Sequence, residues 1–394
     1  MYKKLKLVGM LSLIIVLLFT NEKGVYAEIG SEEEVSDESQ SGLQKLNEYA
    51  LSFGKFIAND ESIYVADILK IYDENGICEY CFDYESGGVP YGYAIYNIEN
   101  SDITVFSIEK GQAGLYEKII SSLSNNIFEK TNILLKNVDL DYFAVLIQDE
   151  EEIAVNRRGE TVKGEALYKM GYNPISTLSY DDIFDISGDL PDTIAYTHYL
   201  KYENYLANSA AYGEGYITRS LKEPYACAVT AMLNVCANNK FYNDKNYKIR
   251  KKAYEDLWLL SGTKYNKNTG EYGTDKNKIG YSVAQFARQN RGVKINYSTK
   301  SNPSVTYFVS AINNGYSSIL GISSACTDGG HTGVAGHAYS VIGFKSYAPC
   351  NNVGNSKIYL KVATGWGTIG NTEYILYNEI NVISKYGTVW KFKP

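Results

Sequence analysis

Histidine, basic charge and long apolar stretches are all scarce in this sequence. Only three of the 394 residues are histidines, and 45 acidic residues outnumber 38 basic ones, for a net charge of −7. A surface that binds a nucleic-acid backbone needs a basic excess, so we expect no nucleic-acid partner. After residue 19 no run is apolar enough to span a bilayer, which takes roughly 20 residues. Internal repeats are also missing.

The first 27 residues have the pattern of an export signal. Three lysines within the first six positions precede an apolar run from Leu7 to Phe19, and Val25-Tyr26-Ala27 supplies the small residues that a signal peptidase inspects. We therefore expect a secreted protein, exported by a bacterial cell. The apolar run is short for a bilayer span, which argues against a membrane anchor. An uncleaved anchor is the alternative, and we expect membrane contact only through this segment.

Six cysteines in an exported chain first suggest disulfides, but their positions argue against pairing. Cys78 and Cys81 lie three apart in a segment with strand character, so they face opposite sides. Cys227 and Cys236 lie nine apart in one predicted helix, again on opposite faces. The last two cysteines flank the ends of a long predicted strand. We expect most of the six to be buried free thiols, and one to need another explanation.

The chain after residue 27 is long enough for two domains, and its 45% apolar content favours packed cores. Changes in composition along the whole sequence indicate five segments. They are a signal peptide (1–27), an acidic disordered lead-in (28–41), a propeptide-like α+β domain (42–180), a linker (181–197) and a second domain (198–394). Helices followed by strands within the last 200 or so residues indicate an α+β fold with two halves.

Hydrophobic periodicity and turn residues predict the individual elements. In the first domain we expect a helix over 43–58, short strands over 64–110, a helix over 115–135 and strands over 142–148 and 153–157. In the second domain we expect helices over 224–239, 247–261, 281–290 and 303–314, and strands over 317–324, 337–347, 356–364, 372–377 and 389–392.

The most informative segment is Glu223-Pro-Tyr-Ala-Cys227-Ala-Val-Thr-Ala-Met232. Pro224 favours a helix start, which places Cys227 in or just before the first turn. The positive helix end and the unpaired N–H groups there stabilise a thiolate, which is the reactive form in acyl transfer. The Cys227 N–H can also bind a developing oxyanion. The alternative is a small apolar residue packed under a loop.

A histidine follows 110 residues later, in Gly333-Val-Ala-Gly336-His337-Ala-Tyr-Ser-Val-Ile-Gly343-Phe344. The glycines allow close approach of a ligand, and we expect His337 at the mouth of a strand that fixes its ring. His337 is therefore the preferred catalytic base. His331, inside the predicted loop, is the rival base, and His198, near the linker, is expected to be structural.

A third segment, Val362-Ala-Thr364-Gly365-Trp366-Gly367, also lies at a predicted strand end. A third group normally orients a catalytic base and fixes its tautomer. We expect the Thr364 hydroxyl to accept a hydrogen bond from the imidazole and Trp366 to cover that bond from water. The alternative is an ordinary turn with an aromatic residue packed beneath it.

Taken in order, these segments resemble those of papain-like cysteine peptidases, most closely the secreted bacterial streptopain and C39-like groups. The resemblance covers residues 196–394. The region before residue 196 resembles a streptopain-type propeptide, but this second likeness is looser. The family resemblance implies a two-lobed C-terminal domain with a helical half and an antiparallel β half, in which Cys227 is the nucleophile, His337 the base, Thr364 the orienting group and Trp366 its shield. It further implies a zymogen that hydrolyses peptide or protein substrates and whose own propeptide is an intramolecular inhibitor. Cys–His acyl transfer needs no cofactor or metal.

Two positions depart from the family pattern. The family usually has Asn or Asp where this chain has Thr364, and no glutamine lies between Ile183 and Cys227 to serve as an oxyanion donor. Arg219, Ser220 or Tyr225 could take the role of that donor. Two other functions therefore stay open. One is an exported papain-fold binding protein without full activity. The other is a cell-wall amidase or endopeptidase, although no wall-binding repeat is present.

Overall fold

Tyrosines and branched apolar residues, which suit a pleated surface, fill the stretch from residue 64 to 108, and it folds into antiparallel strands. The computed structural model describes residues 37–73, 76–121, 129–136, 142–148, 151–157, 161–163, 198–213, 226–266, 271–326, 333–350, 355–366, 370–379 and 384–391. Its elements fall into an N-terminal half, up to residue 163, and a C-terminal half from residue 198.

The N-terminal half begins with a long helix whose apolar face, including Leu46, Tyr49 and Phe53, is buried. The spacing of these apolar residues follows the helical repeat, so their side chains form one stripe along the helix. In chain order the elements are α2 (Asp37–Ala58), β1 (Tyr64–Asp73), β2 (Gly76–Ser86), β3 (Val89–Asn97), β4 (Asp102–Ile108), α3 (Leu115–Ile120), β5 (Glu129–Lys136), β6 (Tyr142–Gln148), β7 (Glu151–Asn156) and β8 (Thr161–Lys163).

The C-terminal half places most of its helices before its long strands. Its elements are β9 (His198–Tyr205), α7 (Cys227–Asn238), α8 (Tyr247–Ser261), β10 (Lys264–Asn266), β11 (Glu271–Gly273), α9 (Lys276–Arg291), β12 (Asn296–Ser301), α10 (Val305–Asn313), β13 (Ser318–Cys326), β14 (Gly333–Pro349), β15 (Lys357–Ala363), β16 (Thr372–Leu376), a 3₁₀ turn (Tyr377–Glu379) and β17 (Ser384–Lys391). The protein is therefore α+β, as predicted.

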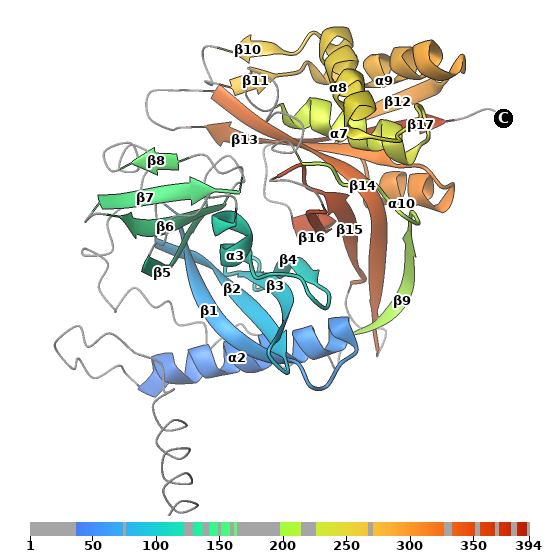
Figure 1. The fold of residues 1–394 in the computed structure, drawn as a ribbon. Coiled ribbons are helices and arrows are strands. Elements are labelled where there is room, and N and C mark those ends of the chain that lie inside the picture. The colour runs from blue at the N-terminus through green and yellow to red at the C-terminus, as the bar shows by residue number, and fades with distance from the viewer. Residues whose placement is uncertain are drawn as a thin grey trace, which may run out of the picture. The chain divides into compact units, whose positions relative to one another are not determined.

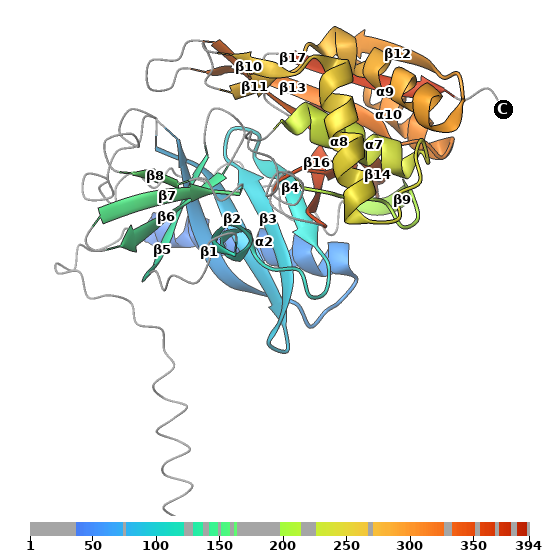
Figure 2. The same cartoon turned by 45° about the horizontal axis from the view of Figure 1, so that its top comes forward.

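Fifteen of the described strands form one mostly antiparallel sheet. Its order is β12-β17-β13-β14-β15-β16-β4-β3-β2-β1-β5-β6-β7-β8, with β9 paired to β14. The pair β1–β5 is parallel. Figures 1 and 2 both show β5 to β8 continuing the sheet beside β1.

Helices cover both faces of the strands in the C-terminal half. Helices α7, α8 and α9 group against β13, β14 and β17 (Figure 1), and their apolar side chains share one core with Trp390. Helix α10 packs on β13, β14 and β17 through Phe308 and Ile312, which belong to a different core. The strands therefore separate two layers of helix, with α7 in one of them.

The two halves are joined by backbone pairing. In the antiparallel pair β4–β16, Val105 lies opposite Ile375 and Phe106 opposite Tyr374. The rings of Phe106 and Tyr374 stack with centroids 4.8 Å apart. Residues 38–394 accordingly form one compact unit.

Side chains reinforce this junction. Tyr347, Tyr359 and Leu376 of the C-terminal half are buried in the same core as α2 and β2 to β4. The Tyr359 hydroxyl donates to the Ile103 carbonyl at 2.9 Å, and Lys357 pairs with Asp102. Full burial of one such large apolar side chain contributes roughly 1.5–3 kcal/mol, so the junction contributes substantially to the stability of the fold.

Most predicted elements are confirmed, with boundaries shifted by a few residues. The predicted helix over 115–135 is wrong in its second part, because residues 129–136 form strand β5. There Ile133 and Leu134 pair with β1, and this tertiary pairing overrides the local helical pattern. The first helix begins at Asp37, so the last residues of the expected lead-in are helical. The predicted signal peptide and linker lie outside the described residues.

Five strands were not predicted at all. Strands β8, β10 and β11 are only three residues long, and the two longer ones are β9 and β12. Their side chains are mostly exposed, and their sequences, such as Asn-Tyr-Ser-Thr-Lys-Ser in β12, lack the alternation of a half-buried strand. They form because partners with open edges are available: β14 for β9 and β17 for β12.

The five cysteines whose side chains the structure describes are free thiols, as predicted. The prediction that most are buried is wrong: Cys81 and Cys236 are buried, Cys78 and Cys227 are half-buried, and Cys350 is exposed. Burial raises the pKa of both the Cys81 and the Cys236 thiol well above the usual value. Among the described helices, none is long and apolar enough to cross a membrane.

Candidate active site

Cys227 is the first residue of α7, as the sequence predicts. Its N-cap residue, Ala226, is extended (φ −134°, ψ 97°), and no side chain caps the helix. Every residue from Ala228 to Ala237 is buried, whereas Cys227 is half-buried. Helix α7 is therefore a central helix whose positive, uncapped end carries an accessible thiol, an arrangement that stabilises a thiolate.

Two amides hold α7 in place. Asn234 accepts from the backbone N–H of Tyr212 at 2.7 Å and donates to its carbonyl at 2.9 Å. Asn238 makes the same pair of bonds with Ala210. Each amide side chain thus bonds to both backbone groups of one residue in the segment that precedes α7. These bonds fix the position of α7, and with it the helix end that carries Cys227.

Folding brings the thiol to the histidine segment. The Sγ of Cys227 donates to the carbonyl oxygen of Gly336 at 3.7 Å, across 109 residues of sequence. Gly336 directly precedes His337, so the predicted nucleophile and the predicted base lie on facing segments of α7 and β14.

His337 lies within strand β14, not at its mouth as predicted. It pairs with Ile322 of β13, and Gly336 pairs with Ser323 in the same ladder. The side chain is 3% exposed. Its Nε2 lies 2.7 Å from the carbonyl oxygen of Thr364. Because a carbonyl only accepts, Nε2 carries the proton and Nδ1 is the basic nitrogen of the neutral ring.

Thr364 therefore orients His337 through its backbone, and the prediction that its hydroxyl does so is wrong. The Oγ1 of Thr364 instead donates to the Asn371 carbonyl at 3.3 Å and accepts from the Trp366 N–H at 3.2 Å. Asn371 also donates to the Trp366 carbonyl at 2.7 Å. The hydroxyl and the Asn371 amide thus shape the turn that presents the carbonyl.

Trp366 stacks on the imidazole, with ring centroids 3.8 Å apart and an interplanar angle of 15°. Tyr339 meets the imidazole edge-on at 4.5 Å. Gly365, between Thr364 and Trp366, has φ +77°, and a Cβ there would contact Thr230 of α7 at 3.6 Å. Glycine permits this left-handed turn, which lies on α7 and brings Trp366 against His337.

A buried ion pair that joins the two halves lies next to this stack. The Arg157 guanidinium is 2.7 Å from Glu373 of β16, with the two side chains 6% and 8% exposed. It also lies 5.4 Å from the Trp366 ring centroid. Tyr93 donates to the same Glu373 carboxylate at 2.5 Å. Glu373 pairs with Val362, two residues before Thr364, so the ion pair borders the Thr364–Trp366 turn.

Tyr386 of β17 lies near the thiol. Its pKa is raised above the usual value, first by burial and then by the charge of Cys227. The ring passes over Gly321, where an added Cβ would fall 1.9 Å from the ring carbon that bears the hydroxyl. Only glycine at position 321 leaves room for this aromatic ring beside α7.

The structure thus brings together Cys227, Gly336, His337, Thr364 and Trp366. Sequence reasoning missed Arg157, Glu373, Asn371 and Tyr386, because their roles arise from strand pairing between distant segments and no local motif marks them. The rival base and the substitute oxyanion donors, His331, Arg219, Ser220 and Tyr225, lie outside the described residues.

Comparison with known proteins adds nothing to this geometry. No protein-family model matches the sequence, and no curated protein matches it either. Function is therefore inferred from the arrangement of the side chains.

Proposed function

We propose that this chain is an exported cysteine endopeptidase of the papain-like type, made as a zymogen. The observation that carries the proposal is the contact between the Cys227 thiol, on the first turn of a buried helix, and the residue that precedes His337. The Nε2 bond of His337 to the Thr364 carbonyl supports it, because that bond leaves Nδ1 as a base. The substrate is a peptide or protein.

In the proposed reaction, Nδ1 of His337 takes the proton of the Cys227 thiol. The thiolate then attacks the peptide carbonyl carbon, and backbone N–H groups at the start of α7 stabilise the oxyanion. The imidazolium returns its proton to the leaving amine. Water, deprotonated by the same nitrogen, releases the acyl group and restores the thiol. The Thr364 carbonyl and the Trp366 ring hold the imidazole in one orientation throughout.

The absence of an Asn or Asp at position 364 does not remove the orienting group. A backbone carbonyl accepts the Nε2–H as a side-chain amide would, and the buried stack with Trp366 restricts the ring plane. This supports catalysis over the alternative of a papain-fold binding protein that has lost its third residue.

The N-terminal half is the proposed intramolecular inhibitor. Its Arg157 pairs with Glu373 of the C-terminal half and lies against the Trp366 ring. It also shares a core and one continuous sheet with the C-terminal half. Cutting the chain within residues 181–197 leaves these contacts in place. The two halves should therefore stay together after the cut, and full activity should require their separation.

The test uses the full chain, with Cys227→Ala beside Cys350→Ala, a control that removes an exposed free thiol. Each protein is cut by an added protease, and chain size, hydrolysis of a quenched-fluorescent peptide set and labelling by a thiol-directed epoxide are followed. We expect hydrolysis and labelling in the wild type and in Cys350→Ala, and neither in Cys227→Ala. If Cys227 stays unlabelled and no peptide is cut, even after the halves are separated, the binding-protein alternative replaces this proposal.

A further inference from the structure

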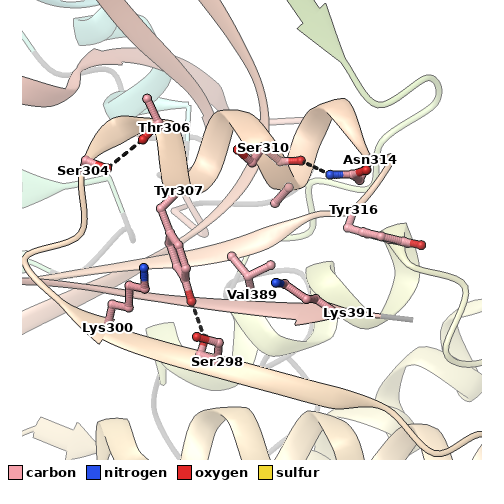
Figure 3. A pocket seen from close by; sticks show the side chains of 11 residues that line it. Ser298, Lys300, Ser304, Thr306, Tyr307, Ser310, Asn314, Tyr316, Val389 and Lys391 are labelled. Atoms are coloured by element: carbon pink, nitrogen blue, oxygen red, sulfur yellow. Dashed lines mark hydrogen bonds between the residues drawn. The ribbon is translucent and has the colours of Figure 1, made fainter. Parts of the chain in front are cut away.

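A polar cavity of about 590 Å³ lies between helix α10 and the strands β12 and β17 (Figure 3). Ser298 and Lys300 come from β12, and Val389 and Lys391 come from β17. The volume falls within the range of roughly 300–1,000 Å³ that small-molecule sites occupy.

This cavity is separate from the Cys227 site. Val389 and Trp390 are successive residues of β17, so their side chains point to opposite faces of the sheet. Trp390 is buried in the core formed by α7, α8 and α9, and its indole N–H donates to the Gly280 carbonyl at 3.1 Å. Val389 lines the cavity on the other face, under α10. The cavity thus lies across the sheet from the helix that carries Cys227.

Its charge is unusual for an acidic protein. Among the described residues that line it are Lys300 and Lys391 and no carboxylate, although the whole chain has a net charge of −7. Within the described ranges, neither lysine forms an ion pair. Two cations that share a hollow without a counterion favour an anionic ligand.

The strand register sets how the two cations are spaced. Ser298 lies opposite Val389 at the centre of the cavity. Lys300 lies two residues to one side of that pair, and Lys391, opposite Asn296, lies two residues to the other side. Four residue positions along paired strands separate the Cα atoms by about 13 Å. A ligand that satisfies both lysines is therefore elongated, with anionic groups near its two ends.

Part of the cavity wall is already ordered. The Tyr307 hydroxyl donates to the Ser298 carbonyl at 2.5 Å, a bond drawn in Figure 3. The Nζ of Lys300 lies 5.0 Å from the centroid of the same ring. This cation–π contact holds the lysine beside the cavity before any ligand binds, which lowers the entropy cost of binding.

Hydroxyl and amide groups make up most of the remaining lining. They come from Ser304, Thr306, Ser310, Asn314 and Tyr316. Such groups both donate and accept, as the hydroxyls of a sugar do. Val389 and the Tyr307 ring add apolar surface for the C–H face of a sugar ring. An acidic peptide is the alternative occupant, because it could use the two lysines, and tetraglutamate, which has no hydroxyl groups, tests it.

We propose that this cavity binds an acidic carbohydrate, that is, a sugar or polyol that carries phosphate or sulfate esters. Lys300 and Lys391 hold its anionic groups, and the hydroxyl row of α10 binds the uncharged part. The site does not depend on the chemistry of Cys227. It would bring the protein to an anionic glycan surface whether or not the protein is a peptidase.

Isothermal titration of the full chain tests the proposal with four probes. They are a sulfated uronic acid–glucosamine disaccharide, a glycerol phosphate trimer, neutral diacetylchitobiose and tetraglutamate. The test variants are Lys300→Gln/Lys391→Gln and Ser310→Ala, and Lys245→Gln/Lys248→Gln is the control with the same charge change on exposed lysines. Unchanged circular dichroism and unfolding midpoints show that the variants fold.

We expect either the sulfated disaccharide or the glycerol phosphate trimer to bind with 1:1 stoichiometry, and which of them binds tells sulfate from phosphate. Its affinity should fall at least about tenfold in the cavity double variant and by less than about twofold in the control. The Ser310→Ala variant should weaken it as well, and the neutral saccharide should bind far more weakly. The proposal is overturned if neither the sulfated disaccharide nor the glycerol phosphate trimer binds, or if the control double variant lowers the affinity as much as the cavity double variant does. Equal binding of tetraglutamate would also overturn it, in favour of an acidic-peptide site.

Discussion

The indole ring of Trp366 stacks on the imidazole of His337, with centroids 3.8 Å apart and planes 15° from parallel. The stack is buried, since both residues are 3% exposed. It leaves the imidazole one orientation, in which Nε2 donates to the Thr364 carbonyl and Nδ1 is the unprotonated nitrogen of the neutral ring.

Truncating Trp366 should lower the catalytic rate by more than the accompanying loss of folding stability explains. In Trp366→Ala the imidazole loses its stacking partner and gains water, and a misplaced catalytic group costs on the order of 10²-fold in rate. Trp366→Phe, which keeps a ring, should retain most of kcat. Peptide hydrolysis by both variants, beside Trp258→Ala on α8 as a control, measures this. Equal rates for Trp366→Ala and Trp258→Ala would contradict the role of the stack.

Replacing the Thr364 hydroxyl should have a small effect. In Thr364→Val the backbone carbonyl remains and still accepts from Nε2, so kcat/KM should fall by less than about tenfold. The lost bonds to Asn371 and Trp366 should cost about 1–2 kcal/mol of unfolding free energy. Kinetics and denaturant unfolding of the same preparation check both values. A 10²-fold or greater loss of kcat in a protein of unchanged stability would instead assign the orienting role to the hydroxyl.

Breaking the Arg157–Glu373 pair should be strongly destabilising. Arg157→Met leaves a buried carboxylate without its cation, which costs about 3–5 kcal/mol, whereas Arg157→Met/Glu373→Met should recover much of that loss. A double-mutant cycle by urea unfolding measures the coupling. The exposed pair Lys252–Asp256 is the control and should show far weaker coupling. Additive effects at the buried pair would contradict a direct interaction.

Acid should destabilise the fold partly through His198. Burial, and next the charge of Lys357, lower the pKa of His198 below its usual value, so the folded protein binds fewer protons there than the unfolded chain. Stability is therefore lost as pH falls from about 6.5 through the lower folded-state pKa. His198→Gln should flatten the curve of unfolding free energy between about pH 5 and pH 6.5. At pH 8 His198 is neutral in both the folded and the unfolded state. The difference in unfolding free energy between the wild type and His198→Gln at that pH is therefore the reference for the comparison at lower pH. Parallel curves throughout would contradict the shift.

Local signals predicted the parts of the site that lie in one segment. The Cys227 helix start, the His337 strand and the Thr364–Trp366 turn each have a short pattern with a physical meaning, and helix α8 was predicted at its observed bounds. The hydroxyl of Thr364 was assigned the wrong role because a sequence identifies side chains, while the acceptor is a backbone carbonyl whose direction depends on the turn.

Other features depend on partners far away in the chain. Arg157 reaches Glu373 across 216 residues, and β4 reaches β16 across more than 260. Strand β12 forms because β17 offers an edge, since its own side chains are polar and exposed. No pattern within β5 or β12 specifies these pairings, so they become visible only in the folded chain.

The pairing of Cys227 with His337 is the central claim, and the pH dependence of Cys227 alkylation tests it most directly. Rates are measured by mass spectrometry of the separate cysteine peptides in the wild type, in His337→Ala and in the control His198→Ala. Cys81 and Cys236 should react slowly in all three, because burial raises the pKa of both thiols. We predict that Cys227 reacts fast near neutral pH in the wild type and in His198→Ala, and at least about tenfold more slowly in His337→Ala. Equal Cys227 rates in all three proteins would contradict the account.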